Sequence, residues 1–283
     1  MPRKVSTLER HRKMLADLDL VRIARDAALA AADYIRTTGR PRGPSGWDEK
    51  SSHDFVSDVD RGAEELIRER IGKAAPGTHI IGEELGPELA LDGATWIVDP
   101  IDGTTNFLHG YPAYAVSVAA AIDGRLAAGV VVHVPDGRLF HAVRGQGAFC
   151  NDEPIRVSTI REPGRALIGT GFPFKDLTGM DRYVEQFRQV AAATAGIRRP
   201  GSAALDLCSV ASGEYDAFWE LSLSAWDIAA GTLIVREAGG RVTDDTGRDI
   251  GIEHGPVVAG NATMHRWMLG VVGRPSQGPG IRD

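Results

Sequence analysis

The chain has 283 residues, of which 43% are hydrophobic and 25% are charged, a composition typical of an ordinary soluble globular protein. The formal net charge of -6 argues against a dedicated nucleic-acid binder, because such proteins normally present a basic face. An acidic protein that acts on an anionic substrate needs compensating positive charge, and bound metal ions would supply it.

The cysteines and the N-terminus indicate the compartment. Cys150 and Cys208 lie far apart in the sequence and in no metal-ligand spacing, so we expect no disulfide framework. The N-terminus is polar and basic, without the apolar segment of a secretory signal, and no apolar run is long enough to span a bilayer. These features predict a protein of the reducing cytoplasm with no membrane segment.

The first part of the chain is predicted to be mainly helical. Residues 1–17 are charged and present no clear apolar face, so we expect a flexible N-terminal arm. Apolar residues recur at helical spacing over Leu18–Thr38 and again over Ala63–Ile71. Between these helices, Lys50–Asp60 is predicted to form a polar turn.

Strands follow the second helix. His79–Gly82 and Trp96–Asp99 are short apolar segments, each predicted to form a strand. Three further apolar runs over Val116–Val143 are joined by Asp-Gly turns at Asp123 and Asp136. Asp-Gly between apolar runs is typical of hairpins, so this region is predicted to be a β-meander.

Strands and helices alternate in the second half of the chain. This order predicts an α+β protein in which sheets and helices form stacked layers, with strand ends meeting at a shared site. We divide the chain into the arm 1–17, an α+β part 18–150 that carries the acidic motifs, an α/β part 151–272 and a loose tail 273–283. The strands predicted in this half are Ala166–Gly169, Asp216–Glu220 and Val257–Ala259, and the helices are Asp181–Ala195, Ala203–Ala211, Ile228–Ala238 and Ala262–Leu269.

The most informative segment is Trp96–Phe107, which has the sequence WIVDPIDGTTNF. An apolar strand runs directly into Asp99 and Asp102, which places two carboxylates at a strand end, where Mg²⁺ finds its preferred oxygen ligands. Gly103 permits close approach of the backbone to a ligand, and Thr104 opens a helical turn with free N–H groups. Taken alone, the segment also fits a turn that ends in an N-cap.

Other acidic residues stand at comparable places. Glu83 follows a predicted strand, Asp227 opens a predicted helix, and Asp60 ends the polar turn before the helix that contains Ala63. Each has an ordinary alternative, which is a solvated loop for Glu83, a helix cap for Asp227 and a polar cap of the following helix for Asp60. Their combination is more specific than any one of them.

Together these segments resemble the inositol monophosphatase family, within the superfamily of magnesium-dependent, lithium-sensitive phosphatases. Gly82–Glu84 is similar to the family's Gly-Glu-Glu, Trp96–Asn106 to its Trp-Ile-x-Asp-Pro-Ile-Asp-Gly-Thr-x-Asn, and Trp226–Gly231 to its Trp-Asp-x-x-Ala-x-Gly. The resemblance covers residues 20–270. It implies an αβαβα layered sandwich with one active site where the layers meet, and a homodimer.

The resemblance also implies a set of Mg²⁺ ligands. Glu83, Asp99 and the carbonyl oxygen of Ile101 would hold a first ion. Asp99, Asp102 and Asp227 would hold a second, and a third would lie near Glu83, which gives two or three Mg²⁺ ions per site. Ser57 departs from the family's common Thr at its position.

Catalysis in the resembled family implies direct attack by a metal-activated water on the phosphorus. Thr104, paired with Asp60, would orient and help to deprotonate this water. The resemblance implies that the catalytic residues are Asp60, Thr104 and Glu83, and that the residues binding the substrate are Asp102, Gly103, Thr104, Ala203 and Glu220.

The implied reaction is hydrolysis of a small phosphate monoester of a polyol or sugar, first of all myo-inositol-1-phosphate, and it needs neither nucleic acid nor a membrane. Fructose-1,6-bisphosphate, histidinol phosphate and 3′-phosphoadenosine-5′-phosphate are alternatives, because the related phosphatases share these motifs. The apolar Leu221 and Leu223, just before Trp226, leave the substrate open.

An alternative of another class is a regulator that binds RNA polymerase or the ribosome-processing machinery, as some bacterial members of the family are thought to do. The basic pair Arg198 and Arg199 would suit a partner, although a solvated helix end accounts for it as well. The complete set of acidic residues favours the enzyme.

Overall fold

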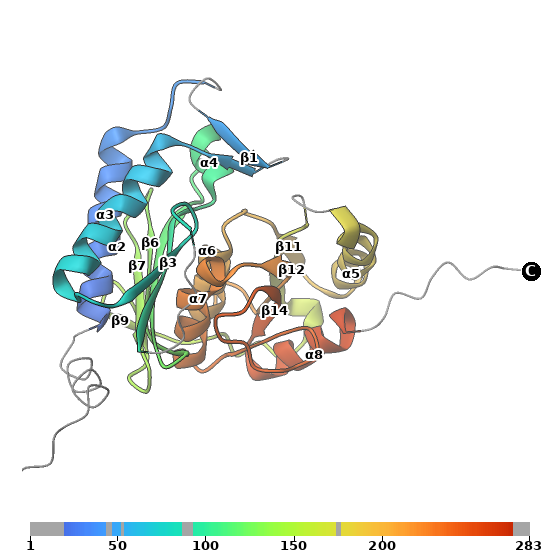
Figure 1. The fold of residues 1–283 in the computed structure, drawn as a ribbon. Helices are drawn as coiled ribbons and strands as arrows, with labels where there is room; N and C mark the ends of the chain where they lie inside the picture. The colour runs from blue at the N-terminus through green and yellow to red at the C-terminus, as the bar shows by residue number, and fades with distance from the viewer. Residues whose placement is uncertain (1–19, 44–46, 52–53, 87–92, 174–176, 274–283) are drawn as a thin grey trace, which may run out of the picture.

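The computed structural model describes residues 20–43, 47–51, 54–86, 93–173 and 177–273 (Figure 1). The arm predicted at 1–17 and nearly all of the tail predicted at 273–283 lie outside these residues. Within the described ranges, no helix combines the length and the apolar character that crossing a membrane requires.

Two helices form the first layer, α2 (Leu20–Thr38) and α3 (Asp58–Ala74). The helix predicted at Leu18–Thr38 is therefore confirmed over the described residues. Its buried face consists largely of alanines, which let α2 approach both α3 and the strands beneath it closely. Helix α3 begins after the N-cap Ser57, whose hydroxyl accepts the N–H of Val59.

A seven-stranded sheet forms the second layer, in the order β3-β4-β5-β6-β7-β8-β9. Strand β3 is parallel to β4, and the other neighbours are antiparallel. The meander predicted at Val116–Val143 is confirmed, and Asp123 and Gly124 both have positive φ in its first turn. The strands are β3 (His79–Gly82), β4 (Ala94–Asp102), β5 (Ala115–Ile122), β6 (Arg125–His133), β7 (Leu139–Val143), β8 (Ala148–Cys150) and β9 (Glu153–Ile155).

Strand β4 differs from its prediction at its end. The sequence indicated a strand that stops at Asp99, but β4 continues through Pro100 to Asp102. Pairing with β3 ends at Val98. Pro100 has no N–H to donate, and it is tolerated in β4 because it lies beyond the residues that pair with β3. The register with β5 shifts between Asp99 and Asp102, and an irregularity of this kind changes the direction in which side chains point.

The remaining layers follow in chain order. Helices α6 and α7 pack between the two sheets, and α5 and α8 cover the outer face of the second sheet. That sheet has the order β11-β10-β12-β14-β13, with β10 parallel to both of its neighbours. The elements are β10 (Leu167–Thr170), α5 (Met180–Ala193), β11 (Gly196–Arg198), α6 (Ala203–Ala211), β12 (Ala217–Leu223), α7 (Ala225–Glu237), β13 (Arg241–Thr243), β14 (Gly255–Gly260) and α8 (Ala262–Val272).

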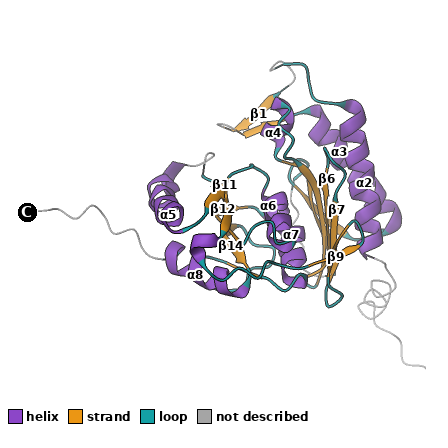
Figure 2. Cartoon of the chain, turned by 180° about the vertical axis from the view of Figure 1, so that it is seen from behind, coloured by secondary structure: helices purple, strands orange, loops and turns teal. Residues whose placement is uncertain are grey.

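These layers confirm the αβαβα sandwich. Seen from behind, α2 and α3 lie on one side of the first sheet and α6 and α7 on the other, with α5 and α8 outermost (Figure 2). The first sheet extends to Ile155 and the second begins at Leu167, so residues 156–166 join the two parts that the sequence analysis divided at residue 150. That division stays a prediction.

Several short strands were missed. Where a polar turn was predicted over Lys50–Asp60, β1 (Asp48–Ser51) pairs antiparallel with β2 (Asp54–Val56). Strands β9, β11 and β13 have three residues each. Three or four residues are too few to show a period of two, and the hydrogen bonds of a neighbouring strand stabilise them instead.

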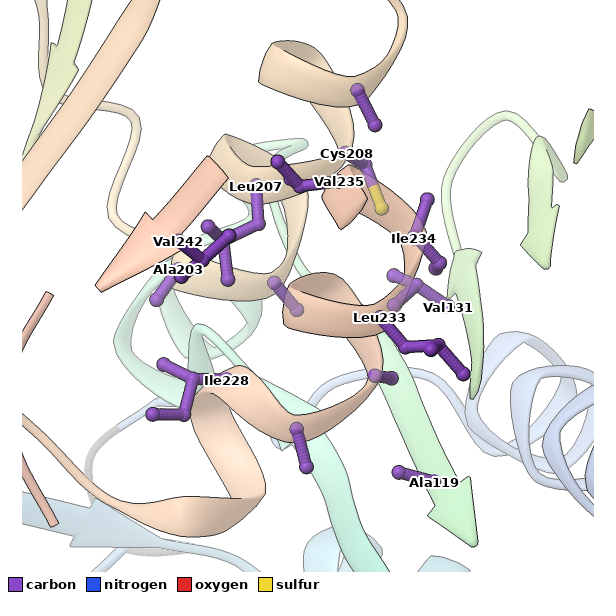
Figure 3. Packing of buried hydrophobic residues seen from close by; sticks show 14 of the residues in the cluster. Ala119, Val131, Ala203, Leu207, Cys208, Ile228, Leu233, Ile234, Val235 and Val242 are labelled. Atoms are coloured by element: carbon purple, nitrogen blue, oxygen red, sulfur yellow. The ribbon is translucent and has the colours of Figure 1, made fainter. Parts of the chain in front are cut away.

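The middle layer shows why the two sheets stay together. Helix α7 buries residues on nearly every side, because it packs against the first sheet, α6 and β13 (Figure 3). At Gly231 the approach to α6 is so close that a Cβ atom would lie 2.6 Å from Cβ of Leu207. Only the missing side chain permits this helix contact.

Gly231→Ala is therefore expected to lower the free energy of unfolding. Overpacking against Leu207 costs about 1–3 kcal/mol, more than the helix propensity that alanine adds. The matched control is Gly270→Ala in α8, where a Cβ would meet nothing within 4 Å and the substitution should stabilise by about 0.5–1 kcal/mol. Denaturant unfolding of both variants measures the difference, and equal stabilisation of the two would contradict the packing argument.

Candidate active site

A cavity of about 1060 Å³ opens where the layers meet. Its walls come from the ends of β3 and β4, from α4 (Thr104–His109), from β12 and from the first turns of α6 and α7. The residues predicted for the site that line the cavity are Glu83, Asp99, Ile101, Asp102, Gly103, Thr104, Ala203, Glu220 and Asp227. The fold thus gathers residues from both halves of the chain into one space.

Three carboxylates converge in this cavity. Asp99 and Asp102 come from the end of β4, and Asp227 comes from the first turn of α7. One oxygen from each lies within 4.8 Å of the others, a spacing that lets a single metal ion contact all three. Glu83 lines the same cavity just after β3.

The Asp99 carboxylate lies among other negative charges. Burial raises the pKa of Asp99 well above its ordinary value, and the negative charges of Glu83, Asp102 and Asp227 raise it further. Among the described residues, Oδ1 of Asp99 has no hydrogen-bond partner although it is buried. A buried, unpaired carboxylate among other acids is unfavourable without a cation, so this donor set fits a hard divalent metal ion.

Asp102 is held from the other half of the chain. Its Oδ2 accepts the Ser202 hydroxyl proton and, at 2.7 Å, the N–H of Ala204 in the first turn of α6. Burial raises the pKa of Asp102 to about 6, although these hydrogen bonds act in the opposite direction. Ser202 and Ala204 could not be predicted as partners, because they lie about 100 residues away along the chain.

Asp227 is both a helix cap and a member of the carboxylate cluster, the two interpretations that its sequence position left open. The N–H of Ser224 donates to its Oδ2 at 2.6 Å, so Asp227 completes the cap of α7. Its other role, as a member of the carboxylate cluster, follows from where α7 begins between the sheets. The capping hydrogen bond therefore also orients the Asp227 carboxylate within the cluster.

Asp60 and Thr104 meet at the side of the cluster. The Thr104 hydroxyl lies 3.1 Å from Oδ1 of Asp60 and 3.0 Å from the carbonyl oxygen of Ile101, so it can donate to either. Oδ2 of Asp60 accepts the N–H of Ser57 at 2.9 Å and also the Ser57 hydroxyl proton. Burial raises the pKa of Asp60, and these hydrogen bonds lower it. The fold brings together a hydroxyl and a buried carboxylate that lie 44 residues apart.

Gly103 has a conformation that favours glycine, with φ of 96°. A Cβ atom there would lie 2.8 Å from the carbonyl oxygen of Ala113 and 3.2 Å from that of Gly201. Asn106, one turn further on, donates to these same two carbonyl groups at 2.7 and 3.2 Å. Asn106 had no predicted role, yet its amide connects α4 to the loop before α6.

Two further residues of the cavity were not anticipated. The solvated helix end predicted for Arg199 is wrong, because Arg199 follows β11, lines the cavity and lies 4.3 Å from the ring centroid of Phe172. Asp206, on α6, is buried, and burial followed by the charges of Glu220 and Asp102 raises its pKa well above the usual range. No local pattern signals either residue, because both depend on how the second sheet packs.

Comparison with known proteins agrees with this geometry. The profile of the inositol monophosphatase family matches residues 17–274. The Nus factor SuhB of Pseudomonas aeruginosa is 44% identical over 268 residues, which cover 93% of this chain and 98% of that protein. The inositol-1-monophosphatase of Rhizobium meliloti is 46% identical over 228 residues, which cover 80% of this chain and 85% of that protein.

Solved structures are similar over the same range. The extragenic suppressor protein suhB from Bartonella henselae has a TM-score of 0.83 at 39% identity, covering 93% of this chain and 100% of that chain. The IMPase of Thermotoga maritima has a TM-score of 0.81 at 32% identity, covering 90% of this chain and 97% of that chain. The chain therefore belongs to the inositol monophosphatase family.

Proposed function

We propose that this chain is a Mg²⁺-dependent phosphatase that hydrolyses myo-inositol-1-phosphate to inositol and phosphate. The observation that carries the proposal is the convergence of Asp99, Asp102 and Asp227 within 4.8 Å in a large cavity. Membership of the inositol monophosphatase family supports the reaction class. The name inositol-1-monophosphatase of a relative that is 46% identical supports this substrate.

The acidic residues would hold two or three Mg²⁺ ions. Glu83, Asp99 and the Ile101 carbonyl oxygen would ligate one, and Asp99, Asp102 and Asp227 another; a third would lie near Glu83. Oxygen ligands of this kind suit Mg²⁺, and the unpartnered Oδ1 of Asp99 is available for coordination. When bound, Mg²⁺ neutralises the phosphate charge and lowers the pKa of a coordinated water.

Thr104 and Asp60 would accept the proton of the attacking water. The Thr104 hydroxyl, directed toward Oδ1 of Asp60, can accept a hydrogen bond from that water through its lone pair. As the water oxygen bonds to phosphorus and the bond from phosphorus to the alcohol oxygen breaks, the proton of the water passes to Thr104 while the Thr104 proton passes to Asp60, and the leaving alcohol oxygen takes up a proton from solvent. Asp60 suits this role because burial raises its pKa and so increases its affinity for a proton.

The substrate would lie across the cavity from the metal cluster to β12. Backbone N–H groups of Gly103 and Thr104 would contact the phosphate oxygens. The alcohol half would meet Glu220, Asp102 and the backbone at Ala203. A volume of about 1060 Å³ is at the upper end for small-molecule sites, which run to about 1,000 Å³, so the cavity also accommodates alcohols larger than inositol.

Phosphate release across a substrate panel tests the proposed specificity. The panel contains D- and L-inositol-1-phosphate, fructose-1,6-bisphosphate, histidinol phosphate and 3′-phosphoadenosine-5′-phosphate, each with and without Mg²⁺. We expect kcat/KM to favour an inositol phosphate by about 100-fold, or about 2.7 kcal/mol of transition-state binding. Li⁺ is expected to inhibit this Mg²⁺-dependent activity.

Comparable rates on every compound would replace the specific assignment with a generalist phosphatase. A preference of the same size for another member of the panel would identify that compound as the substrate. Absence of activity with Mg²⁺ on all of them would contradict the enzymatic proposal.

Asp99→Asn separates the metal site from the fold. In EDTA the variant should unfold at the same temperature as the parent or higher, because burial and neighbouring acids already disfavour the Asp99 charge. At 100 times Kd, Mg²⁺ should stabilise the parent by about 2.7 kcal/mol but the variant far less. Turnover should fall by about 100-fold or more, since even the partners that only orient metal ligands usually contribute about 10–100-fold.

The matched control is Asp206→Asn, which removes an equally buried carboxylate from the same cavity but outside the cluster of three. It should keep the stabilisation by Mg²⁺. Thermal unfolding with and without Mg²⁺ measures both variants, and equal stabilisation of Asp99→Asn and the parent would contradict the proposed ligand set.

A second candidate function is binding to the transcription machinery. The observation that favours it is the 44% identity to a protein named Nus factor SuhB, over nearly its whole length. We also propose a homodimer in the cytoplasm, a reducing compartment that suits the free Cys150 and Cys208. The acidic cluster is complete, so this second function would accompany catalysis.

Light scattering followed by titration with purified bacterial RNA polymerase tests both points. The chain alone should have about twice the monomer mass of 30.3 kDa. Saturable binding of the polymerase at physiological salt would support the second function, and absence of binding would contradict it. A mass equal to that of the monomer would contradict the proposed homodimer.

A further inference from the structure

Behind the acidic cavity lies a carboxylate that the proposed mechanism does not use. Glu64, on α3, is completely buried and does not line the cavity. Its Oε2 accepts the N–H of Glu84 at 2.8 Å, and its Oε1 accepts the N–H of Leu85 at 3.3 Å and Nε–H of Arg68 at 2.8 Å. A buried carboxylate needs such partners, and here two of them belong to the turn that carries Glu83.

The turn contacts this carboxylate directly. A Cβ atom at Gly82 would lie 2.0 Å from Oε1 of Glu64 and 2.4 Å from its Cδ. Any side chain at Gly82 would therefore displace the Glu64 carboxylate from the N–H groups that it accepts. Position 82 therefore requires glycine because the Glu64 carboxylate occupies the space of a side chain, and not because the backbone has a special conformation.

The backbone around Glu83 is thus held at three consecutive residues. Gly82 pairs with Val98 of β4, the N–H of Glu83 donates to the carbonyl oxygen of Val98 at 3.3 Å, and the N–H of Glu84 donates to Glu64. Since β3 ends at Gly82, no ladder hydrogen bond holds the chain beyond Glu83. Glu64 supplies the anchor that the strand no longer provides.

One face of helix α3 contacts two different segments of the cavity wall. Asp60 and Glu64 lie four residues apart, so they project from the same side of the helix. Asp60 accepts the Thr104 hydroxyl proton, while Glu64 holds the turn after β3. Arg68, one further turn along, pairs with Glu64 and is partly exposed.

We infer that Glu64, with Arg68 as its counter-ion, is a positioning residue that holds Glu83 in place to bind Mg²⁺. The inference rests on the proposed function, in which Glu83 is a ligand. Partners that orient metal ligands in this way usually contribute 10–100-fold to metal affinity or activity. Glu64 touches neither substrate nor metal, so its effect is on metal loading rather than on the chemical step.

Glu64→Gln tests the inference in the full chain. Glutamine keeps one carbonyl acceptor, but its NH₂ group opposes the N–H donors of the turn. Calorimetric titration of the metal-free protein should show Mg²⁺ affinity about 10-fold or more below that of the parent. At saturating Mg²⁺, kcat should return to near the parent value, because the ligands themselves are unchanged.

The matched control is Glu65→Gln, which removes the same charge from the adjacent, exposed position of α3. It should leave Mg²⁺ affinity and turnover unchanged. A lower melting temperature of Glu64→Gln with unchanged Mg²⁺ affinity would mean that Glu64 only stabilises the fold, and would overturn the inference.

Two more variants keep the test decisive. If Glu64→Gln does not fold, Arg68→Met removes only the partly exposed counter-ion and should also weaken Mg²⁺ binding; unchanged affinity would count against the inference.

Glu83→Gln separates the ligand role of Glu83 from the positioning role of Glu64. If it leaves Mg²⁺ affinity unchanged, the ligand role of Glu83 is wrong. If it weakens binding while Glu64→Gln does not, only the positioning role is wrong.

Discussion

Three carboxylates held with oxygens within 4.8 Å of one another repel, and the burial of Asp99 and Asp102 strengthens this repulsion. The surrounding structure therefore has to hold each of them by contacts directed away from the cluster. Asp102 is held by Ser202 and the N–H of Ala204, and Asp227 by the N–H of Ser224. Asp99 keeps an unpartnered oxygen among the described residues, so the cluster is rigid on its outer side and open to a cation at its centre.

The layered architecture makes these anchors available. Helices α6 and α7 lie between the two sheets, and the first turn of each faces the cavity that receives the end of β4. Helix N-termini present free N–H groups and a partial positive charge, which suit both the acidic side chains and a phosphate. Gly231 lets the two helices approach closely enough for both N-termini to reach the same space.

The cavity wall differs in chemistry from one side to the other. One side carries the acidic cluster together with Gly103 and Thr104. Another part of the cavity wall combines the apolar Leu221 and Leu223 with Arg199, whose guanidinium lies over the Phe172 ring. In the proposed reaction these residues would face the alcohol half of the substrate, so specificity would depend on β12 and on the loop after β11 rather than on the acidic cluster.

The sequence by itself determined the family, the layered α+β class and nearly every residue of the acidic cluster, because these depend on local patterns. The helix at Leu20, the meander and the segment from Trp96 to Asn106 all carry their signal within one short stretch. Only the tertiary structure decided that β4 continues to Asp102, that Arg199 lines the cavity, that Ser202 binds Asp102 and that Glu64 binds the turn after β3. The short strands such as β1, β11 and β13 were likewise decided there. Each of these features depends on hydrogen bonds or packing between segments distant in the chain, and no periodicity along a single segment records such a contact.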